Sequence, residues 1–408
     1  MRIVPTPTLA PAPAAAGPLR VLDVTIFYAP VSGGVRTYLD MKADDFRTRG
    51  VAHAMAVPGP ERGRRRMGAT TVHLLRGLPV PFTPGYRLMY SAAELERVIR
   101  EERPDVIEVG SPFLVPLLLE KAMGALGGTR IPTVGFYHAD LVRTYVEPYV
   151  RHFPARAREA LRARARRFVR RVYSRFDVTV AASASVAREL RLLGLDRVEH
   201  ISLGVDLETF RPTRRSDALR RRLGVPDHVP IALFAGRLCP EKGLGVVVKA
   251  HGEMPPGARP HLLFVGEGPS TGRLERLARS RPDLTLLPVI SERDELARIY
   301  ASSDFYLAAG PGETFGLAVV EALASGLPLL GVDSGAVKDR VRASKAGELY
   351  GPGDPKSCAE AMSRLSRGPL DKLARRARSY AEEELGWDTT FRRLSSLYRR
   401  LARVGALP

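Results

Sequence analysis

Two glutamates eight residues apart, Glu313 and Glu321, form the most informative spacing of side chains in this 408-residue sequence. Glu313 follows a glycine- and proline-rich turn, and Glu321 lies in an apolar run with helical spacing (Leu317, Val320 and Ala324). Eight residues of helix rise about 12 Å, which is too far for two carboxylates that share one proton. The distance instead suits an elongated ligand with hydroxyl groups at both ends and phosphates between them, such as a nucleotide sugar.

The helix that follows Glu313 and contains Glu321 has a marked C-terminal end. Gly326 stands at the C′ position, and Pro328 follows two residues later. Strands are expected before the helix at residues 305–308 and after it at residues 327–332. Such a unit belongs to a parallel sheet, in which the helix N-terminus lies beside the carboxyl ends of the strands.

The N-terminal end of the same helix is a candidate anion site. Backbone N–H groups of Phe315, Gly316 and Leu317 would be free there, and Gly316 lets a ligand approach the backbone closely. A plainer alternative is that Glu313 only complements the helix dipole and that Glu321 is a solvated helix residue.

Two loops in the first half of the chain have polar residues where parallel sheets place ligands. Gly33 and Gly34 follow an expected strand at residues 19–25 and precede a helix, which is the geometry of phosphate approach. His138 and Asp140 come directly after a further expected strand. By itself, His138 could equally be a loop histidine bonded to a backbone carbonyl.

In the second half, the stretch G-R-L-C-P-E-K-G follows an expected strand at residues 231–236. Gly236 begins this turn, Arg237 and Lys242 flank it, and Gly243 opens a helix. Two cations together with helix N–H groups can neutralise a departing diphosphate. The alternative is a pair of surface cations in a loop.

These motifs together resemble a known family. The stretch E-T-F-G-L-A-V-V-E-A-L-A-S-G-L-P at residues 313–328 is similar to the Glu-x7-Glu signature of retaining glycosyltransferases with the GT-B fold, the large fourth family of the sequence classification. The stretches S-G-G-V-R-T-Y-L, F-Y-H-A-D and G-R-L-C-P-E-K-G are similar to the family's glycine loop, histidine loop and diphosphate-binding turn. The resemblance extends over residues 19–400 and is loosest at residues 58–100.

The resemblance implies an α/β fold of two Rossmann-like domains with parallel sheets facing a deep cleft. We expect a disordered leader at residues 1–18, an acceptor domain at residues 19–211 and a nucleotide-sugar domain at residues 212–386. A C-terminal helix at residues 387–408 would cross back onto the first domain.

The resemblance also implies a reaction, the transfer of a hexose from a nucleoside-diphosphate sugar with retention at the anomeric carbon. Mannose or glucose is the favoured sugar, and a lipid or saccharide of envelope biosynthesis is the expected acceptor. The implied residues at the reacting centre are His138, Arg237, Lys242 and Glu313, with Asp140 toward the acceptor. The implied donor-binding residues are Gly33, Gly34, Gly236, Gly266, Val289, Ile290, Phe315, Gly316, Leu317 and Glu321, of which Glu321 would bind the ribose.

No metal or other cofactor is expected, because the sequence has no Asp-x-Asp pair. Three alternatives stay open. A GT-B epimerase would use the same nucleotide half with acid and base carboxylates in the first domain. A soluble transferase would act on a small-molecule acceptor, and a non-catalytic scaffold would not need the polar residues of these motifs.

The formal charge of +19 and the isoelectric point near 10.4 reflect 55 arginines and only eight lysines. Such a skew can follow from a GC-rich genome. Residues 151–176, which begin with Arg151 and end with Phe176, hold ten arginines and one glutamate, with an apolar stripe through Leu161 and Phe168. They predict an amphipathic helix with a solvated basic face, or a contact with an anionic membrane. No nucleic acid partner is expected, since no aromatic platform interleaves the cations.

The two cysteines, Cys239 and Cys358, fit no disulfide framework and no metal spacing, which favours a reducing compartment. No apolar run reaches the 18 residues of a membrane span. The expected location is therefore the cytoplasm, with peripheral attachment to the inner face of the membrane as the alternative.

Overall fold

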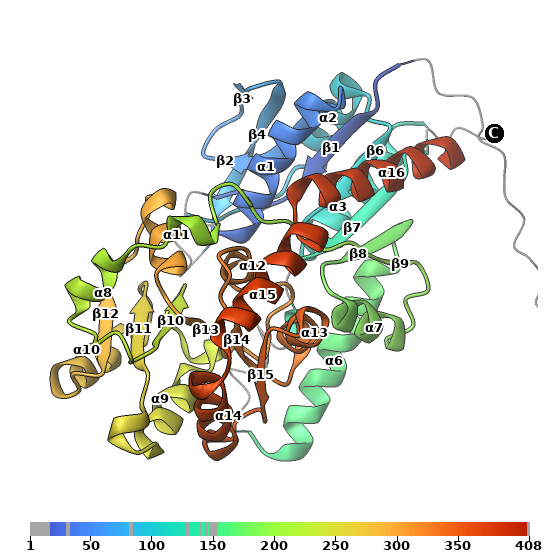
Figure 1. The fold of residues 1–408 in the computed structure, drawn as a ribbon. Helices are drawn as coiled ribbons and strands as arrows, with labels where there is room; N and C mark the ends of the chain where they lie inside the picture. Colours follow the sequence, from blue (N-terminus) through green and yellow to red (C-terminus); the bar gives the residue numbers. More distant parts are fainter. Residues whose placement is uncertain are drawn as a thin grey trace, which may run out of the picture.

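A computed structural model describes residues 17–29, 33–80, 85–127, 130–138, 140–142, 146 and 153–405. Two sheets built mainly from parallel strands lie beside one another, each flanked by helices (Figure 1). None of the helices in these ranges has the length and apolar character needed to cross a membrane. Most of the expected leader, residues 1–16, lies outside the described residues.

The N-terminal sheet has nine strands among the described residues, in the order β3-β4-β2-β1-β6-β7-β8-β9 with β5 beside β4. Only β3 and β5 run antiparallel to their neighbour. Asp23 of β1 lies opposite Glu108 of β6. The strands are β1 (Arg20–Val24), β2 (Ala52–Gly59), β3 (Gly63–Met67), β4 (Thr70–Pro79), β5 (Arg87–Met89), β6 (Val106–Val109), β7 (Thr133–Tyr137), β8 (Val178–Ala181) and β9 (Val198–His200).

The C-terminal sheet has six parallel strands in the order β12-β11-β10-β13-β14-β15. Its central strands are buried on both faces, which is typical of a sheet covered by helices. The strands are β10 (Ile231–Ala235), β11 (His261–Val265), β12 (Leu284–Leu287), β13 (Phe305–Ala308), β14 (Leu329–Val332) and β15 (Gly347–Tyr350).

Helices alternate with the strands in both halves. Several begin at a side chain that accepts a hydrogen bond from the first turn, as Ser91, Ser183 and Asp354 do. The helices are α1 (Gly34–Thr48), α2 (Ala92–Glu102), α3 (Val115–Gly124), α6 (Ala155–Tyr173), α7 (Ala184–Leu192), α8 (Asp217–Leu223), α9 (Leu244–Glu253), α10 (Thr271–Ser280), α11 (Arg293–Ala301), α12 (Leu317–Ala324), α13 (Gly335–Ser344), α14 (Pro355–Arg367), α15 (Leu370–Glu384) and α16 (Trp387–Gly405).

The last helix, α16, belongs spatially to the first half of the chain, as Figure 1 shows in red against blue. Phe391 and Tyr398 of α16 are fully buried, and both rings pack against Phe46 of α1 with centroid distances of 6.1 and 6.3 Å. The predicted crossing of the C-terminal helix is thereby confirmed.

The structure also confirms the predicted strands that flank the candidate motifs, within one or two residues at each end. Strands β3, β4 and β5 fall in the region of loosest resemblance and were not predicted individually. Strand β3 reads G-R-R-R-M, and its three arginines are exposed. Such a strand carries no apolar alternation, because it is held by backbone pairing with β4 rather than by burial of a face.

Candidate active site

The turn after β10 carries the two predicted cations and is pressed against the end of β13. Gly243 has φ +70°, and a Cβ at this residue would lie 2.3 Å from the carbonyl oxygen of Ala309. Only a glycine fits this close approach. Lys242, the preceding residue, is therefore held beside the loop that leads from β13 into α12.

Lys242 and Glu313 meet at that place. Nζ of Lys242 donates a hydrogen bond to Oε1 of Glu313, and the two groups form a partly buried ion pair. Burial opposes the charge on Lys242, but the Glu313 carboxylate outweighs it and raises the pKa of the amine. Arg237, the other cation of the turn, is largely exposed and pairs with Glu241 at 2.6 Å.

Helix α12 begins one residue after Gly316, which has φ +76°. Three of its eight residues are only partly buried, and these are Leu317, Ala318 and Glu321. Their spacing places them on one side of the helix. This side faces away from the core, and two of its residues line the cavity described next.

A cavity of about 230 Å³ lies over the carboxyl ends of β10 and β13. Six of the predicted site residues line it, namely Gly236, Arg237, Lys242, Glu313, Gly316 and Leu317. The structure thus joins the cationic turn, the first glutamate and the helix start in one site.

The N-terminal half of the chain closes onto this site at two points. A Cβ at Gly34 would lie 3.1 Å from Cδ1 of Leu317, so the start of α1 faces the start of α12. The hydroxyl of Thr314 donates a hydrogen bond of 2.8 Å to the carbonyl oxygen of His138. His138 therefore lies across the domain boundary from Glu313, which precedes Thr314.

The imidazole of His138 is packed between aromatic rings. It stacks on Phe136 at a centroid distance of 4.1 Å and an angle of 4°, and the ring of Tyr38 lies 5.4 Å away. Burial, together with the nearby charge of Lys42, lowers the pKa of His138 to about 3. At neutral pH this side chain is uncharged, so it can position a ligand by packing and hydrogen bonding but not as a cation.

Asp140, the predicted acceptor contact, is buried, with 5% of its surface exposed. Its Oδ1 accepts a hydrogen bond from the backbone N–H of Val142 at 3.0 Å. This contact stabilises the local turn, as short polar side chains commonly do.

Glu321 lies on the same side of α12 as the cavity but does not line it. Burial raises the pKa of Glu321 to about 7, against the opposing effects of Arg293 and of the Tyr300 hydroxyl. Tyr300 donates a weak hydrogen bond of 3.4 Å to Oε2. Asp206, from the end of the first half of the chain, also raises this pKa.

Besides Gly33, Gly34 and Glu321, four more predicted donor residues lie outside the cavity lining, and they are Gly266, Val289, Ile290 and Phe315. A Cβ at Gly266 would lie 2.0 Å from the carbonyl oxygen of Gly236, so this glycine permits two loops to pack together. Val289 is half exposed, and Phe315 is buried beneath the guanidinium of Arg340 at 4.7 Å.

Sequence reasoning missed three residues that shape the site. Tyr306 lines the cavity and donates a hydrogen bond of 3.1 Å to the Ala235 carbonyl. Thr314 bonds across to the His138 loop. Arg293 acts on Glu321 from the start of α11. Thr314 was adjacent to a predicted residue, but nothing in the sequence marked Tyr306 or Arg293, which reach the site only through the packing of the strands and of α11.

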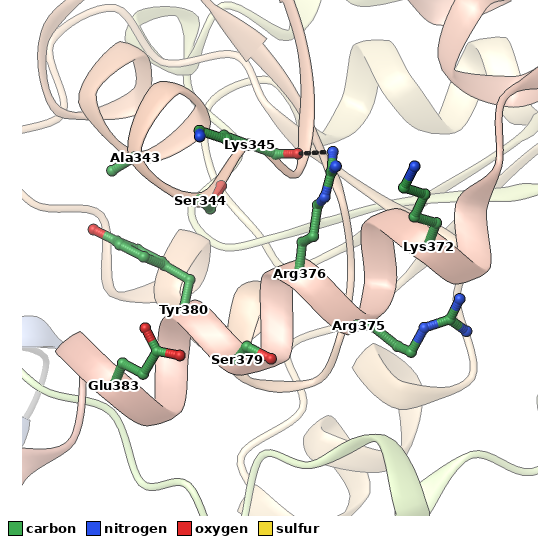
Figure 2. Close-up of a pocket in the computed structure, with 9 residues that line it drawn as sticks. All are labelled: Ala343, Ser344, Lys345, Lys372, Arg375, Arg376, Ser379, Tyr380 and Glu383. Carbon is green, nitrogen blue, oxygen red and sulfur yellow. Dashed lines mark hydrogen bonds between the residues drawn. The ribbon is translucent and has the colours of Figure 1, made fainter.

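Figure 2 shows a second hollow, of about 540 Å³, between the end of α13 and one side of α15. Arg376 donates a hydrogen bond of 3.3 Å to the carbonyl oxygen of Lys345 there. The side chains of Lys345 and Arg375 extend to opposite sides (Figure 2), so the cations do not converge on one point. No predicted site residue lines this hollow.

Among the described residues, one group could hold a metal ion, formed by His73, Glu101 and Glu102. Arg64 already pairs with both carboxylates, at 2.6 and 3.7 Å. None of these residues lines the cavity over β10 and β13.

Family models match both halves of the chain. The model described as Glycosyltransferase Family 4 matches residues 32–209, and the model described as Glycosyl transferases group 1 matches residues 215–384. A relative that is 31% identical matches 82% of this chain and 85% of its own length. The chain belongs to the group 1 glycosyltransferases, and it is a glycosyltransferase.

That relative is a GDP-mannose-dependent alpha-mannosyltransferase of Mycobacterium tuberculosis, matched over 343 residues. A second relative from the same organism, a GDP-mannose-dependent alpha-(1-6)-phosphatidylinositol dimannoside mannosyltransferase, is 29% identical over 367 residues, which cover 89% of this chain and 92% of the relative. The sulfoquinovosyl transferase SQD2 of Arabidopsis thaliana is 28% identical over 343 residues, which cover 80% of this chain and 62% of that protein.

Solved structures share the fold. Sucrose-phosphate synthase from Thermosynechococcus elongatus superposes with a TM-score of 0.76 at 18% identity, over 95% of this chain and 100% of that chain. The catalytic domain of starch synthase IV from Arabidopsis thaliana, bound to ADP and acarbose, gives a TM-score of 0.69 at 15% identity, over 95% and 100% of the two chains. The predicted GT-B fold is confirmed.

Proposed function

We propose that this glycosyltransferase moves a hexose, with mannose from GDP-mannose favoured, to a lipid or saccharide acceptor with retention of anomeric configuration. The observation that carries the proposal is the meeting of Lys242 with Glu313 at the start of α12. This pair puts a cation for a diphosphate beside a carboxylate for sugar hydroxyls. The mannosyl and GDP assignment is supported by the printed names of the Mycobacterium tuberculosis relatives.

In this proposal the protein acts mainly by stabilising negative charge on the leaving diphosphate. Lys242 would exchange its bond to Glu313 for a phosphate oxygen, and Arg237 would swing from Glu241 to the same group. The backbone N–H groups at Gly316 and Leu317 would add the positive end of the helix dipole. Glu313, released from Lys242, would accept hydrogen bonds from the sugar, while Glu321 would bind the ribose.

His138, from the first domain, would contact one side of the bound sugar. Its carbonyl bond to Thr314 ties it to the residue next to Glu313, so both sides of the sugar are set by one contact between the domains. Because the imidazole is neutral, the proposal gives it a positioning role and no charge at the reacting carbon.

We propose that transfer needs no bound metal, because Lys242 and Arg237 can supply the positive charge that a divalent cation supplies in other transferases. Transfer measured with and without a chelator tests this point. A rate that falls on chelation and returns with Mg²⁺ or Mn²⁺ would contradict it.

We further propose that α6 holds the protein against an anionic membrane surface in the cytoplasm, close to a lipid acceptor. Phe153, Leu161 and Phe168 are exposed, at 49%, 36% and 41% of their surface, among arginines of the same segment. Figure 1 shows α6 running from the N-terminal sheet toward the edge of the molecule. Apolar side chains between exposed cations suit the boundary between lipid headgroups and acyl chains.

Thermal unfolding against GDP-, UDP-, ADP- and dTDP-sugars is the first test. A ligand at a hundred times its Kd adds about 2.7 kcal/mol to the free energy of unfolding. Stabilisation by GDP-mannose alone supports GDP-mannose as the donor. Stabilisation by a different nucleotide class identifies that class as the donor and contradicts the proposal. Incubation of the stabilising donor without acceptor then separates a transferase from an epimerase, because only an epimerase would return an isomeric nucleotide sugar.

A further inference from the structure

A cluster of buried polar side chains lies behind His138, in the core of the first domain. Lys42 of α1 is 0% exposed. Its Nζ lies 2.8 Å from Oδ1 of Asp23, 3.2 Å from Oε1 of Glu108 and 3.0 Å from the hydroxyl of Tyr398. These side chains come from a helix, two neighbouring strands and the C-terminal helix, so four separate segments meet at one amine.

A cluster of buried charges fills a core at a high cost in desolvation free energy. Removing charges from water costs free energy, and apolar side chains of the same volume often serve stability equally well. Burial and the neighbouring Asp23 raise the pKa of Glu108 to about 7, against the opposing charge of Lys42. The fixed directions of hydrogen bonds are what a polar cluster offers and an apolar core does not.

One of these fixed directions leads to His138 through Tyr38. The Tyr38 hydroxyl donates a hydrogen bond of 2.8 Å to Oε1 of Glu108. The ring of Tyr38 then lies 5.2 Å from Phe136 and 5.4 Å from His138. Gly110, two residues after Glu108, completes the enclosure, because a Cβ there would lie 3.3 Å from Nε2 of His138. Strand β6 and α1 thus set the walls around the imidazole.

The other oxygen of the same carboxylate is held by the C-terminal helix. The Tyr398 hydroxyl donates a hydrogen bond to Oε2 of Glu108. Trp387 and Phe391 of α16 also pack beside Tyr38, with ring centroids 6.4 and 6.0 Å away. Both the hydroxyl and the ring of Tyr38 therefore depend on groups that α16 supports.

The segment that leads into α16 contacts the donor half as well. Arg378 of α15 donates hydrogen bonds to the carbonyl oxygen of Ala324, at the end of α12, and to that of Phe210, at 2.8 and 2.9 Å. The stretch from α15 to α16 thus contacts α12, the helix that contains Glu321, and also the residues that surround His138.

We propose that Glu108 and Tyr398 are positioning residues for His138, and that they act by holding Tyr38 between them. The inference rests on the proposed function insofar as His138 serves the transfer reaction. Tyr38 and Tyr398 donate to the two oxygens of one carboxylate, which Lys42 also contacts, so the loss of either hydroxyl removes one of the three contacts that fix its orientation. The Tyr38 ring then loses its fixed position, and His138 loses one wall.

The first experiment compares Tyr398→Phe with the wild type in steady-state transfer. We expect kcat to fall about tenfold to a hundredfold, as misplacement near 1 Å can cost, with the KM for the donor changed less than about twofold. The matched control is Tyr350→Phe, which removes a buried hydroxyl that has no hydrogen-bond partner among the described residues. We expect no change in kcat for this control.

A double substitution separates positioning from a general effect on the fold. In a His138→Ala background, Tyr398→Phe should lower kcat by less than about twofold, because its effect passes through His138. An undiminished loss in that background overturns the proposal. If Tyr398→Phe unfolds the protein at assay temperature, Tyr38→Phe tests the same link with α16 left intact.

A second readout needs no turnover. In protein with isotope-labelled histidine, the imidazole signals of His138, assigned with His138→Gln, should shift in Tyr398→Phe. Those of His251 and His261, in the other domain, should stay in place. A shift of His53 alone, which bonds Asp23 at 2.5 Å, would mean that the cluster only supports the fold and would overturn the proposal. If nucleotide sugars show no turnover, the proposed function fails, while this measurement still decides the link to His138.

Discussion

Lys242 and Glu313, 71 residues apart in sequence, are joined by a hydrogen-bonded ion pair in the lining of the cavity over β10 and β13. Each residue is proposed to bind a different part of the donor, so the pair must open when the ligand enters. Until then each side chain neutralises the charge of the other. This arrangement leads to the first prediction.

Lys242→Ala should reduce transfer by about a hundredfold to a thousandfold, the loss typical of removing one preorganised donor to developing negative charge. The thermal shift caused by the nucleotide sugar should also disappear. Lys249→Ala is the matched control, because Lys249 is an exposed lysine on the helix that follows the same turn. Equal transfer rates in Lys242→Ala and wild type would remove the diphosphate role from this turn.

Glu321 should make donor binding depend on pH. Burial raises its pKa to about 7, so the carboxyl is protonated below that pH and ionised above it. An ionised carboxylate can accept hydrogen bonds from both ribose hydroxyls, whereas the protonated acid has less acceptor capacity. We therefore expect the Kd for the donor to fall about tenfold between about pH 6 and about pH 8, measured by calorimetry.

Glu321→Gln is the control for this dependence and should bind equally at both pH values. The same group affects stability in the opposite sense. Its pKa in the folded protein is raised above the ordinary value of 4.5. The folded state therefore binds more protons than the unfolded state between about pH 4.5 and about pH 7, and stability falls as the pH rises through that window. Glu321→Gln should flatten this slope, and an unchanged slope would assign the titration to another group.

We predict that residue 34 must be a glycine, because a side chain there would lie between the two domains where they touch. A Cβ would lie 3.1 Å from Cδ1 of Leu317, so Gly34→Val should hold the domains apart. We expect donor affinity to fall by about tenfold, or about 1.4 kcal/mol. The double variant Gly34→Val with Leu317→Ala should recover part of the loss, since it removes the side chain that the valine meets.

Gly245→Val is the steric control for Gly34, because a Cβ at Gly245 meets nothing within 4 Å. It should leave donor affinity unchanged. If the double variant does not recover donor affinity, the valine at residue 34 blocks the ligand itself rather than the approach of α12.

Helix α6 should bind anionic vesicles through its exposed arginines. Simultaneous Arg164→Gln, Arg167→Gln and Arg171→Gln should weaken binding by about two orders of magnitude, at about 1 kcal/mol for each charge. Flotation with vesicles containing phosphatidylserine measures this, and the binding should fade as salt is raised.

Three exposed arginines of the other domain provide a control of equal charge change, and they are Arg221, Arg222 and Arg279. Their replacement by glutamine should leave vesicle binding nearly unchanged. Equal weakening by both sets would mean that the net charge of +19, rather than α6, attracts the membrane.

The α6 segment also shows the limits of periodicity. The sequence predicts an apolar stripe on this helix, and Val172 in that stripe is indeed buried. Leu161 and Phe168 belong to the same predicted stripe, yet both are exposed, whereas Val169, the residue after Phe168, is fully buried. The spacing correctly predicted an amphipathic helix, but the tertiary fold decided which of its apolar residues are covered, and these are Val169, Val172 and Tyr173.

The sequence alone determined the positions of α12, of the glycine turns and of the strands before them, because these depend on local chemistry. A left-handed glycine such as Gly316 or Gly326, a proline and an apolar spacing act within a few residues. The family signature adds the order of the domains and the crossing of the last helix.

Only the tertiary structure decided which distant side chains meet. The bond of Lys242 to Glu313, the close approach of Gly34 to Leu317 and the packing of Tyr38 against α16 all join segments that local patterns treat separately. The sequence likewise did not predict the burial of Lys42, because this residue lies in an otherwise polar stretch that is typical of an exposed lysine. Its burial follows from the register that sets Asp23 opposite Glu108 and from α16 closing over both, and no local pattern carries that information.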